Sequence, residues 1–510
     1  MLQIRLTDLT LDAFGKYLSQ ILEKFSDLID ASLGTCNCSQ LAAPVCRKLE
    51  KIIQEFVPPN LADFVTEILL ADLLMTYNNL DRDFSKKRRR LQKSLKQLSI
   101  YYKHMTTSLC SAVLHPSVNT FKFSRLQFPQ VNHLEARIFI NYFLSIILKN
   151  LSHIRSLKLE IYEFDEDVIK ENVKIMGNLE ELVFFGCSDA VMKVISDSCR
   201  KLSYIDLSNS TNITNSSVDS ILRLRNLEHL KMIRTQIRSE GIELLFQEGS
   251  NFEQFNYLHS FLDPQHLELV PNRFLNLKTL GIFIYETYNL KPLKELKHLR
   301  NFGILFCFVH GSLIGLEEFL QSIGPQLDSF ELHDFRELEF IDIFRIVAEN
   351  CTRIDNLILK SMSYGVSYEE SDLTPSLNIP VMSSVKFCSL TVSYTSLLKV
   401  SVPKLVNVKV LKCTSLDQMY VPFVMELLLE MKNNKYDEVI VGNCPLHVSV
   451  DNVTLRKSNG SYVFTHWDDY DLVDMLKKIQ SGKNFDFRAH CFLEVAKYSY
   501  IVNCFQDVAK

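Results

Sequence analysis

The stretch Leu202-Ser203-Tyr204-Ile205-Asp206-Leu207 decides the fold, because its spacing of apolar residues recurs along the chain. The pattern is an apolar residue, two variable residues, a second apolar residue, one variable residue and a third apolar residue. Clear copies lie at Ile154-Leu157-Leu159, Leu179-Leu182-Phe184, Leu227-Leu230-Met232 and Leu277-Leu280-Ile282. Weaker copies extend the series and are Val118-Phe121-Phe123, Phe252-Phe255-Tyr257, Leu299-Phe302-Ile304, Leu327-Phe330-Leu332, Ile354-Leu357-Leu359, Met382-Val385-Phe387, Leu405-Val408-Val410 and Tyr436-Val439-Val441.

The period of this pattern predicts the architecture. From Leu157 to Val439 the central residues advance 282 positions in eleven steps, a mean of about 26 residues, and leucine-rich repeats have units of 20–29. The alternation at the end of each copy places apolar side chains on one face of a short strand. Helical spacing follows, as at Val191, Val194 and Ile195. We therefore predict an α/β solenoid, a leucine-rich-repeat horseshoe over residues 90–445 with short parallel strands on the concave face and helices on the convex face.

Cysteines at two positions of the repeat make this chain resemble the cysteine-containing leucine-rich repeats of F-box receptor proteins and their relatives. One position follows the strand by three residues, and the other closes the preceding helix. Cys187, Cys307, Cys413 and Cys444 are assigned to the first position, and Cys199 and Cys351 to the second. The resemblance implies a subunit that captures a protein substrate for a ubiquitin ligase and leaves catalysis to its partners.

Residues 1–85 have the apolar spacing of a helical N-terminal module. Two segments, Leu6-Thr7-Asp8-Leu9-Thr10-Leu11 and Val57-Pro58-Pro59-Asn60-Leu61-Ala62, resemble the N-terminal box of Zyg-type receptors, which dock on Elongin and a cullin. Thr10 departs from that family, which usually has a cysteine in the first helix, and the proline pair also resembles the start of an F-box. The resemblance implies that an Elongin- or Skp1-type adaptor is bound by Leu6, Leu9, Pro58, Pro59 and Leu61. The alternative is a plain helical cap, which every solenoid needs on its first repeat.

Beyond residue 445 the repeat pattern fades, and residues 446–510 are predicted to form a C-terminal cap. Alternation from Val448 to Val463 around Asn459-Gly460 predicts a hairpin, and Trp467 is expected to anchor the cap. At the other end, the basic run from Lys86 to Arg90 is interpreted as a solvated linker, with a nuclear import signal as the alternative.

The residue directly after the third apolar position of each repeat is predicted to point into the concave groove. In the first six repeats of the series this position holds large apolar residues except at Ser208, whereas a merely solvated surface would be polar, and His333 and Lys360 follow in the next two. Side chains stacked strand over strand form a continuous column suited to binding a protein segment. The predicted partner-binding residues are Phe185, Ile233, Leu258, Phe283 and Leu305.

Composition excludes several other functions. The chain has 56 basic and 60 acidic residues, a formal charge of −4, so no net field attracts nucleic acid or a membrane surface. Its 13 scattered cysteines suit reduced, buried thiols and a cytoplasmic or nuclear location. No catalytic motif, cofactor loop or metal-ligand set is found, and Cys36-Asn37-Cys38 with Cys46 lacks a second pair.

These observations predict a non-enzymatic, protein-binding solenoid without cofactor or metal. Its expected role is the substrate-recognition subunit of a cullin-type ubiquitin ligase. The alternative is a leucine-rich-repeat scaffold or regulator with no link to ubiquitin.

Overall fold

The computed structural model describes two compact units of the chain. The first holds residues 1–261 and 272–274, and the second holds residues 262–271 and 275–510. The described residues are 38–71, 73–75, 104, 106–124, 133–162, 164–248, 255–284, 287–306, 313–336, 340–362, 379–392, 395–415, 438–442, 454–458 and 461–465. Among these residues, none of the helices combines the length and the apolar character that a bilayer span requires.

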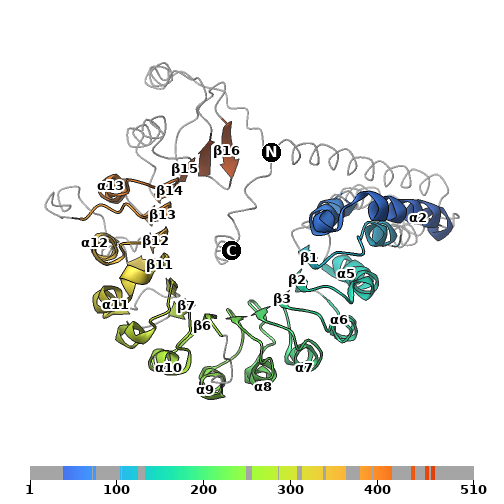
Figure 1. The fold of residues 1–510 in the computed structure, drawn as a ribbon, viewed down its shortest axis with the longest axis horizontal. Helices are drawn as coiled ribbons and strands as arrows, with labels where there is room; N and C mark the ends of the chain where they lie inside the picture. Colours follow the sequence, from blue (N-terminus) through green and yellow to red (C-terminus); the bar gives the residue numbers. More distant parts are fainter. Residues whose placement is uncertain are drawn as a thin grey trace. The chain divides into compact units, whose positions relative to one another are not determined.

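The first unit is a parallel sheet with helices along one side (Figure 1). Its strands follow one another in chain order, and they are β1 (Thr120–Ser124), β2 (Ser156–Glu160), β3 (Glu181–Phe184), β4 (Tyr204–Asp206), β5 (His229–Lys231) and β6 (Tyr257–Phe261). The helices are α2 (Cys38–Phe56), η1 (Pro59–Leu61), α5 (His133–Ile147), η3 (Leu148–Leu151), α6 (Glu166–Val173), α7 (Asp189–Ser198), η4 (Asn215–Ser217), α8 (Val218–Leu222) and α9 (Ser239–Glu248). Residues 62–71, 73–75 and 106–112 are also helical.

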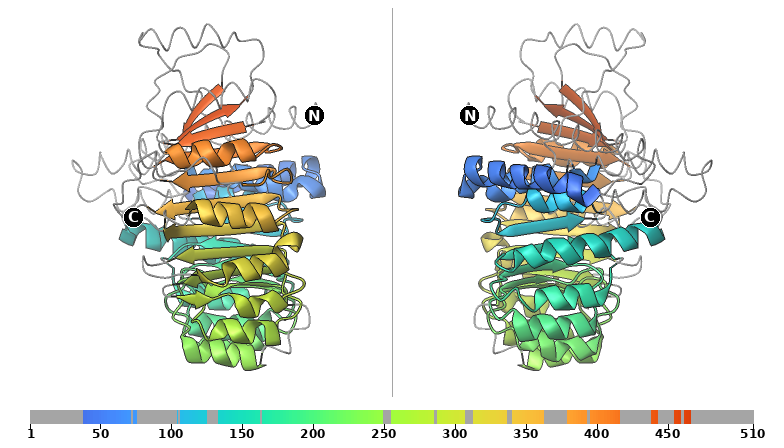
Figure 2. Two further views of the ribbon diagram at one scale, coloured as in Figure 1. Left: turned by 90° about the vertical axis from the view of Figure 1, so that its left-hand side faces the viewer. Right: turned by 90° about the vertical axis from the view of Figure 1, so that its right-hand side faces the viewer.

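The second unit repeats this plan. Its main strands are β7 (Thr279–Ile284), β9 (Asn301–Phe306), β11 (Ser329–Arg336), β12 (Asn356–Met362), β13 (Phe387–Val392), β14 (Val410–Ser415) and β15 (Glu438–Gly442). The helices are α11 (Leu316–Ile323), α12 (Phe340–Asn350), α13 (Thr395–Ser401), η6 (Lys291–Glu295), η7 (Gly324–Gln326) and η10 (Val402–Lys404), and the boundary with the first unit crosses α10 (His266–Arg273). Figure 2 shows the helices outside the strands.

Two smaller strand groups complete the second unit. β8 (Tyr288–Asn289) and β10 (Leu313–Ile314) form a parallel pair of their own. β16 (Thr454–Ser458) and β17 (Ser461–Thr465) pair antiparallel, and β17 joins the edge of β15. The hairpin expected between residues 448 and 463 is thus confirmed in its two strands, whereas Trp467 lies outside the described residues.

The apolar pattern forms the core between sheet and helices. In the first unit the central strand residues align in register from repeat to repeat and are at most 1% exposed; they are Phe121, Leu157, Leu182, Ile205, Leu230 and Leu258. Each buried side chain of this kind contributes about 1.5–3 kcal/mol of transfer free energy. Stacked parallel strands, outer helices and the recurring buried columns confirm the predicted leucine-rich-repeat solenoid.

Three weak repeats lie three residues later than the sequence pattern predicted. The register of the strands places Leu258 at the centre of β6, Cys388 at the centre of β13 and Leu411 at the centre of β14. The sequence pattern had placed Phe255, Val385 and Val408 at these three positions. The physical reason is that each repeat also buries an apolar residue three positions before the centre, so the pattern matches twice. Leu258 is therefore a core residue with no exposed surface, and its prediction as a groove residue was wrong.

The cysteines of the repeats fall into two groups. Cys199 closes α7 and Cys351 follows α12, as predicted, and burial raises the pKa of each thiol to about 12. Cys187 is buried after β3, in the predicted position. Cys413 was assigned wrongly, because it pairs with Leu390 inside β14. Cys307 and Cys444 lie outside the described residues.

The N-terminal helical residues cap the first strand. Between repeats, one backbone carbonyl accepts hydrogen bonds from two successive amides of the next repeat. The carbonyl of Arg155, for example, accepts from the amides of Glu180 (2.7 Å) and Glu181 (2.9 Å). At β1 the amides of Asn119 and Thr120 donate instead to Asp63 Oδ1, at 2.7 and 3.0 Å. The Asp63 carboxylate thus takes the place that a backbone carbonyl holds between the other described repeats, and it caps the backbone at the start of β1.

Candidate partner-binding surface

The face of each sheet opposite its helices, here called the open face, carries the candidate site. The predicted groove residues differ in how far their side chains are exposed on this face. Phe185 and Ile233 are half-buried in the first unit, and Phe283 of β7 is buried at 7% exposed in the second. Leu305 occupies its predicted register in β9, beside Phe283 and His333, but its side chain is outside the description. The first unit therefore offers two of the five predicted side chains for contact.

The first unit also carries three adjacent rings on its open face, tilted by 31° and 33° against one another, which the sequence interpretation missed. Tyr204, His229 and Tyr257 are neighbours in the register of β4, β5 and β6. Their ring centroids lie 5.5 Å apart for Tyr204 and His229, and 5.2 Å apart for His229 and Tyr257. All three are half-buried, so this aromatic ladder stays partly accessible on the open face.

Lys231 fixes the ladder from one side. It lies two residues after His229, and its ammonium is 5.9 Å from the Tyr204 ring centroid and 5.4 Å from that of Tyr257. A cation over two rings is attracted by their electron-rich faces. The Asp206 carboxylate lies 3.9 Å from the Lys231 ammonium and balances its positive charge. The same carboxylate accepts a hydrogen bond from the Ser208 amide. Because Lys231 is only 18% exposed, the ladder is held in one arrangement.

Burial also affects the phenol of Tyr204. Loss of water on burial raises the pKa of this group above its ordinary value, and the positive charge of Lys231 opposes that shift. A phenol with a raised pKa keeps its proton at neutral pH, so Tyr204 contributes a neutral hydroxyl to the ladder.

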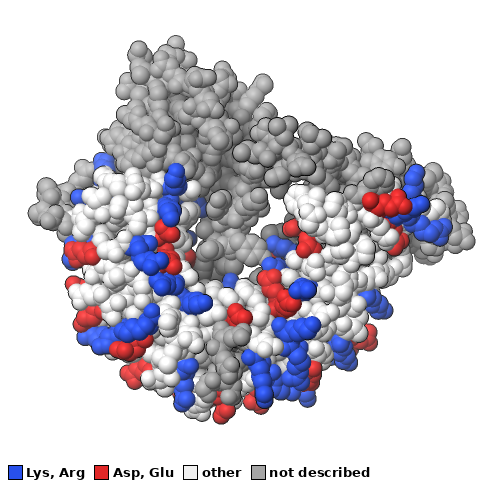
Figure 3. Space-filling model, viewed as in Figure 1, with Lys and Arg blue, Asp and Glu red and all other residues white. Residues whose placement is uncertain are grey.

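The acidic and basic side chains of this face form pairs. Lys158 lies 2.8 Å from Glu181, and Lys122 lies 3.7 Å from Glu160. With Lys231 and Asp206, three cations face three anions. Figure 3 shows basic and acidic side chains together on the visible side of the first unit. The surface thus favours a ligand recognised by shape and ring contacts more than by net charge.

An apolar margin runs beside the ladder at the ends of the strands. The Phe185 ring stacks on Tyr162, with centroids 6.2 Å apart, and Tyr162 is 49% exposed. Ile233 and Phe261 occupy the corresponding positions of later repeats and are half-buried. Ser208 interrupts the series, as predicted, and its buried hydroxyl has no hydrogen-bond partner among the described residues. Phe261 takes the place that the sequence pattern gave to Leu258.

The open face of the second unit is chemically different. Asn301 donates to Thr279 and Asn356 donates to Ser329, each at 3.0 Å, so a polar column replaces the rings. Gly281 and Gly303 are paired in the next column. Beyond them, His333 lies 3.7 Å from Glu331. Phe387 of β13 and Val410 of β14 continue the polar column and are half-buried. The described part of this face therefore combines amides, small residues, the His333–Glu331 pair and apolar side chains.

The predicted adaptor-binding residues are only partly described. Pro58 and Pro59 are exposed and Leu61 is half-buried in and beside η1, close in sequence to the capping Asp63. Leu6, Leu9 and the basic run from Lys86 to Arg90 lie outside the described residues. The structure therefore leaves the adaptor role as a prediction.

No catalytic or metal constellation stands out in the described part of the chain. There, no group of three His, Cys, Asp or Glu side chains is arranged to hold a metal ion. The described thiols are poor nucleophiles, because burial raises their pKa values, that of Cys46 to about 11 and that of Cys413 to about 12.

Comparisons with known proteins give fold-level likenesses only. No family model matches the sequence, and no curated protein is similar to it. Among solved structures, the chain is similar to the yeast Rad7–Elc1 complex (16% identity, 70% of this chain and 78% of that chain, TM-score 0.34). It is also similar to internalin C2 of Listeria monocytogenes (16%, 48% and 83%, 0.26) and to a leucine-rich-repeat protein of Leptospira interrogans (13%, 59% and 81%, 0.29). These TM-scores are low, so nothing about function follows from the likenesses.

Proposed function

We propose that this leucine-rich-repeat chain is a non-enzymatic protein-binding subunit and that the open face of its first unit contacts the bound protein. The observation that carries the proposal is the ladder of Tyr204, His229 and Tyr257 beside the apolar margin of Phe185 and Ile233. Tyrosine rings and their apolar neighbours dominate protein interfaces, because they bury large areas at low entropic cost. A rigid sheet holds these rings before a partner arrives, which reduces the cost of binding.

The more specific proposal is that the N-terminal module joins this surface to a cullin-type ubiquitin ligase. Its support is the sequence resemblance of residues 6–11 and 57–62 to receptors that dock on Elongin and a cullin. The exposure of Pro58 and Pro59 is compatible with such a contact. Asp63 favours a second candidate, a scaffold without a ubiquitin link, because its two hydrogen bonds already give the module a structural role.

Co-purification separates these two functions. The full chain is mixed with recombinant Elongin B–C or with a Skp1-type adaptor, and the bound fraction is measured. A ligase receptor retains one adaptor and loses it in a Pro58→Ala/Pro59→Ala variant, whereas Arg345→Ala on the outer helix α12 leaves retention unchanged. Absence of binding by the wild-type chain to either adaptor contradicts the ligase proposal and favours the scaffold.

A further inference from the structure

Cations gather on the edge of the first unit where the outer helices lead into the strands. Residues 174–180, 199–203 and 223–228 form three successive loops there, after α6, α7 and α8. They hold five basic and two acidic residues. Figure 3 shows more basic than acidic side chains on the visible side around α7 and α8. Four of the basic side chains are exposed and form no ion pair with a described residue; this cation row consists of Lys174, Arg200, Lys201 and Arg225.

Hydrogen bonds hold the three loops side by side. The Lys201 ammonium donates to the side-chain oxygen of Asn178 in the preceding loop, at 2.8 Å. The side-chain amide of Asn226 in the following loop donates to the backbone carbonyl of Arg200, at 2.9 Å. Both partners are neutral, so they position the loops without compensating any positive charge. The cation row therefore forms one surface that spans three repeats.

The other cations of this edge are already paired. Arg155 lies 3.3 Å from Glu180, and Arg223 lies 2.9 Å from Asp197. The remaining acid of the three loops is Glu228, which is half-buried. Four exposed cations thus face one partly covered carboxylate, and the row keeps a net positive charge.

The corresponding loops of the second unit show how such charges are neutralised elsewhere. The backbone position that Ser203 holds in the first unit, directly before a strand, is held there by Asp328 and Asp355. Asp328 lies 3.0 Å from Arg353, and Asp355 lies 2.9 Å from Lys386. A cation near a helix C-terminus stabilises the helix whether or not it is paired. Helix stability therefore does not explain why the first unit lacks these acids.

A short acidic segment of a partner protein fits the cation row better than a long polyanion does. The whole chain has a formal charge of −4, so a nucleic acid or an anionic membrane meets repulsion beyond the row. The three loops contain no aromatic residue on which a base could stack. Guanidinium groups such as those of Arg200 and Arg225 bind carboxylates through two parallel hydrogen bonds. Ile175, which is 50% exposed beside Lys174, offers an apolar contact to the same segment.

We propose that the cation row binds an Asp- and Glu-rich segment of a partner protein, which runs along the helix-to-strand edge across three repeats. This inference goes beyond the open-face proposal, because the row lies outside the strands that carry the aromatic ladder. The two surfaces bind independently, and either proposal can fail without the other.

The test is fluorescence anisotropy with the full chain and a labelled dodecapeptide of three Glu-Glu-Asp-Leu units at low ionic strength. Its control is a peptide of three Gln-Gln-Asn-Leu units, which keeps the side-chain shapes and removes the charge. Saturable binding of the acidic peptide alone is expected. Added salt is expected to weaken this binding, because it screens exposed charges.

Substitutions in the loops locate the contact. Arg200→Ser/Lys201→Ser is expected to weaken binding on the order of tenfold and Arg225→Ser by about threefold, as for exposed ion pairs. Ser203→Asp removes no cation but supplies the acid that the second unit has, and it is also expected to weaken binding by about threefold. Lys193→Ser is the matched control, because it removes an exposed cation of α7 outside the row and leaves binding unchanged. Circular dichroism and thermal midpoints show that each variant is folded.

Several outcomes overturn the proposal. They are equal binding of the two peptides, no binding of either, and binding that survives Arg200→Ser/Lys201→Ser or falls equally in Lys193→Ser. Tighter binding of a ten-nucleotide uridine RNA or of phosphatidylserine vesicles also overturns it, because the row would then serve another class of partner. The open-face proposal is tested separately, by crosslinking from Ile233.

Discussion

The open faces of the two units share a backbone arrangement and differ in the side chains that they carry. In β4 to β6 of the first unit, the position before the central strand residue holds Tyr204, His229 and Tyr257. In the second unit this position is polar from β7 to β12 and holds half-buried Phe387 and Val410 in β13 and β14. The buried columns are alike in both units, with Leu230 and Leu280 equally inaccessible. The repeat therefore determines the fold through its inward positions, while the outward positions are free to differ and to carry binding.

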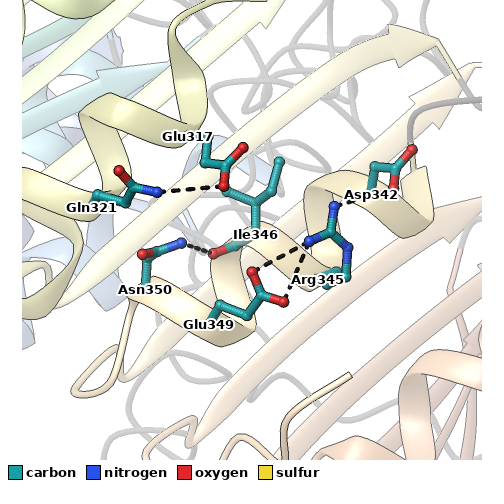
Figure 4. A network of polar contacts seen from close by, with 7 residues as sticks. All are labelled: Glu317, Gln321, Asp342, Arg345, Ile346, Glu349 and Asn350. Atoms are coloured by element: carbon teal, nitrogen blue, oxygen red, sulfur yellow. Dashed lines mark hydrogen bonds and ion pairs between the residues drawn. The ribbon is translucent and has the colours of Figure 1, made fainter. Parts of the chain in front are cut away.

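The outer helices give a third kind of surface. On α12, Arg345 lies 3.3 Å from both carboxylate oxygens of Glu349 and 3.5 Å from Asp342, and on α11 Gln321 donates to Glu317 (Figure 4). These contacts join residues of one helix across three or four positions and are solvent-exposed. They stabilise single helices and offer no ring or apolar group, so they contrast with the ladder.

The largest effect is expected from a pair of substitutions in β6. Leu258→Asp places a charge in the core and is expected to destabilise the chain by more than about 4 kcal/mol, enough to prevent soluble expression. Phe261→Asp changes a half-buried residue of the open face and is expected to cost about 1–2 kcal/mol. Thermal unfolding and soluble yield measure both. Equal tolerance of the two changes would place Leu258 on the open face after all.

A smaller loss is expected when the cation of the ladder is removed. Lys231→Met keeps the aliphatic stem but leaves the nearly buried Asp206 without its cation, and one amide still donates to that carboxylate. We expect a destabilisation of about 1–3 kcal/mol. The Lys231→Met/Asp206→Asn double variant should recover part of it, as measured by thermal unfolding. A double variant whose loss equals the sum of the single losses would show that the pair is uncoupled.

The cap makes a comparable but local contribution. Asp63→Ala leaves the amides of Asn119 and Thr120 to water, with an expected cost of about 1–2 kcal/mol. Asp63→Asn keeps an oxygen acceptor and is expected to cost less than half as much. Hydrogen exchange at residues 119 and 120 reports the effect directly. Unchanged hydrogen exchange at these two amides in Asp63→Ala would show that Asp63 does not cap β1.

The smallest effect is expected on the outer helices. Arg345→Ala breaks exposed contacts within α12, and surface ion pairs of this kind are worth 0–1 kcal/mol. A change in thermal midpoint close to the error of measurement is expected. A loss as large as that of Lys231→Met would erase the distinction between the two faces.

Most of the solenoid could be predicted from the sequence, because its buried positions repeat. Leu182, Ile205 and Leu230 lie where the pattern placed them. The prediction failed at β6, β13 and β14. In β6, Ser260 occupies a core position that is apolar elsewhere, and Phe255 gives a competing match. That error of three residues placed Tyr257 in the core, so the ladder of three rings was missed.

The cap and the ion pairs could not be predicted for a different reason. The contact of Asp63 with Asn119 joins residues 56 positions apart, and no local pattern encodes it. The pairing of Lys231 with Asp206 depends on the register of two neighbouring strands. The signal that was available is three successive aromatic residues before the central strand position, and it becomes visible only with the correct register.

The central claim is that the open face of the first unit, and not that of the second, binds protein. Site-specific photo-crosslinking tests it most directly, with a benzophenone amino acid at Ile233 in one sample of the full chain and at Asn301 in another. The account predicts intermolecular adducts with a discrete partner from position 233 and none above background from position 301. Adducts of equal yield from both positions, or from position 301 alone, would contradict it.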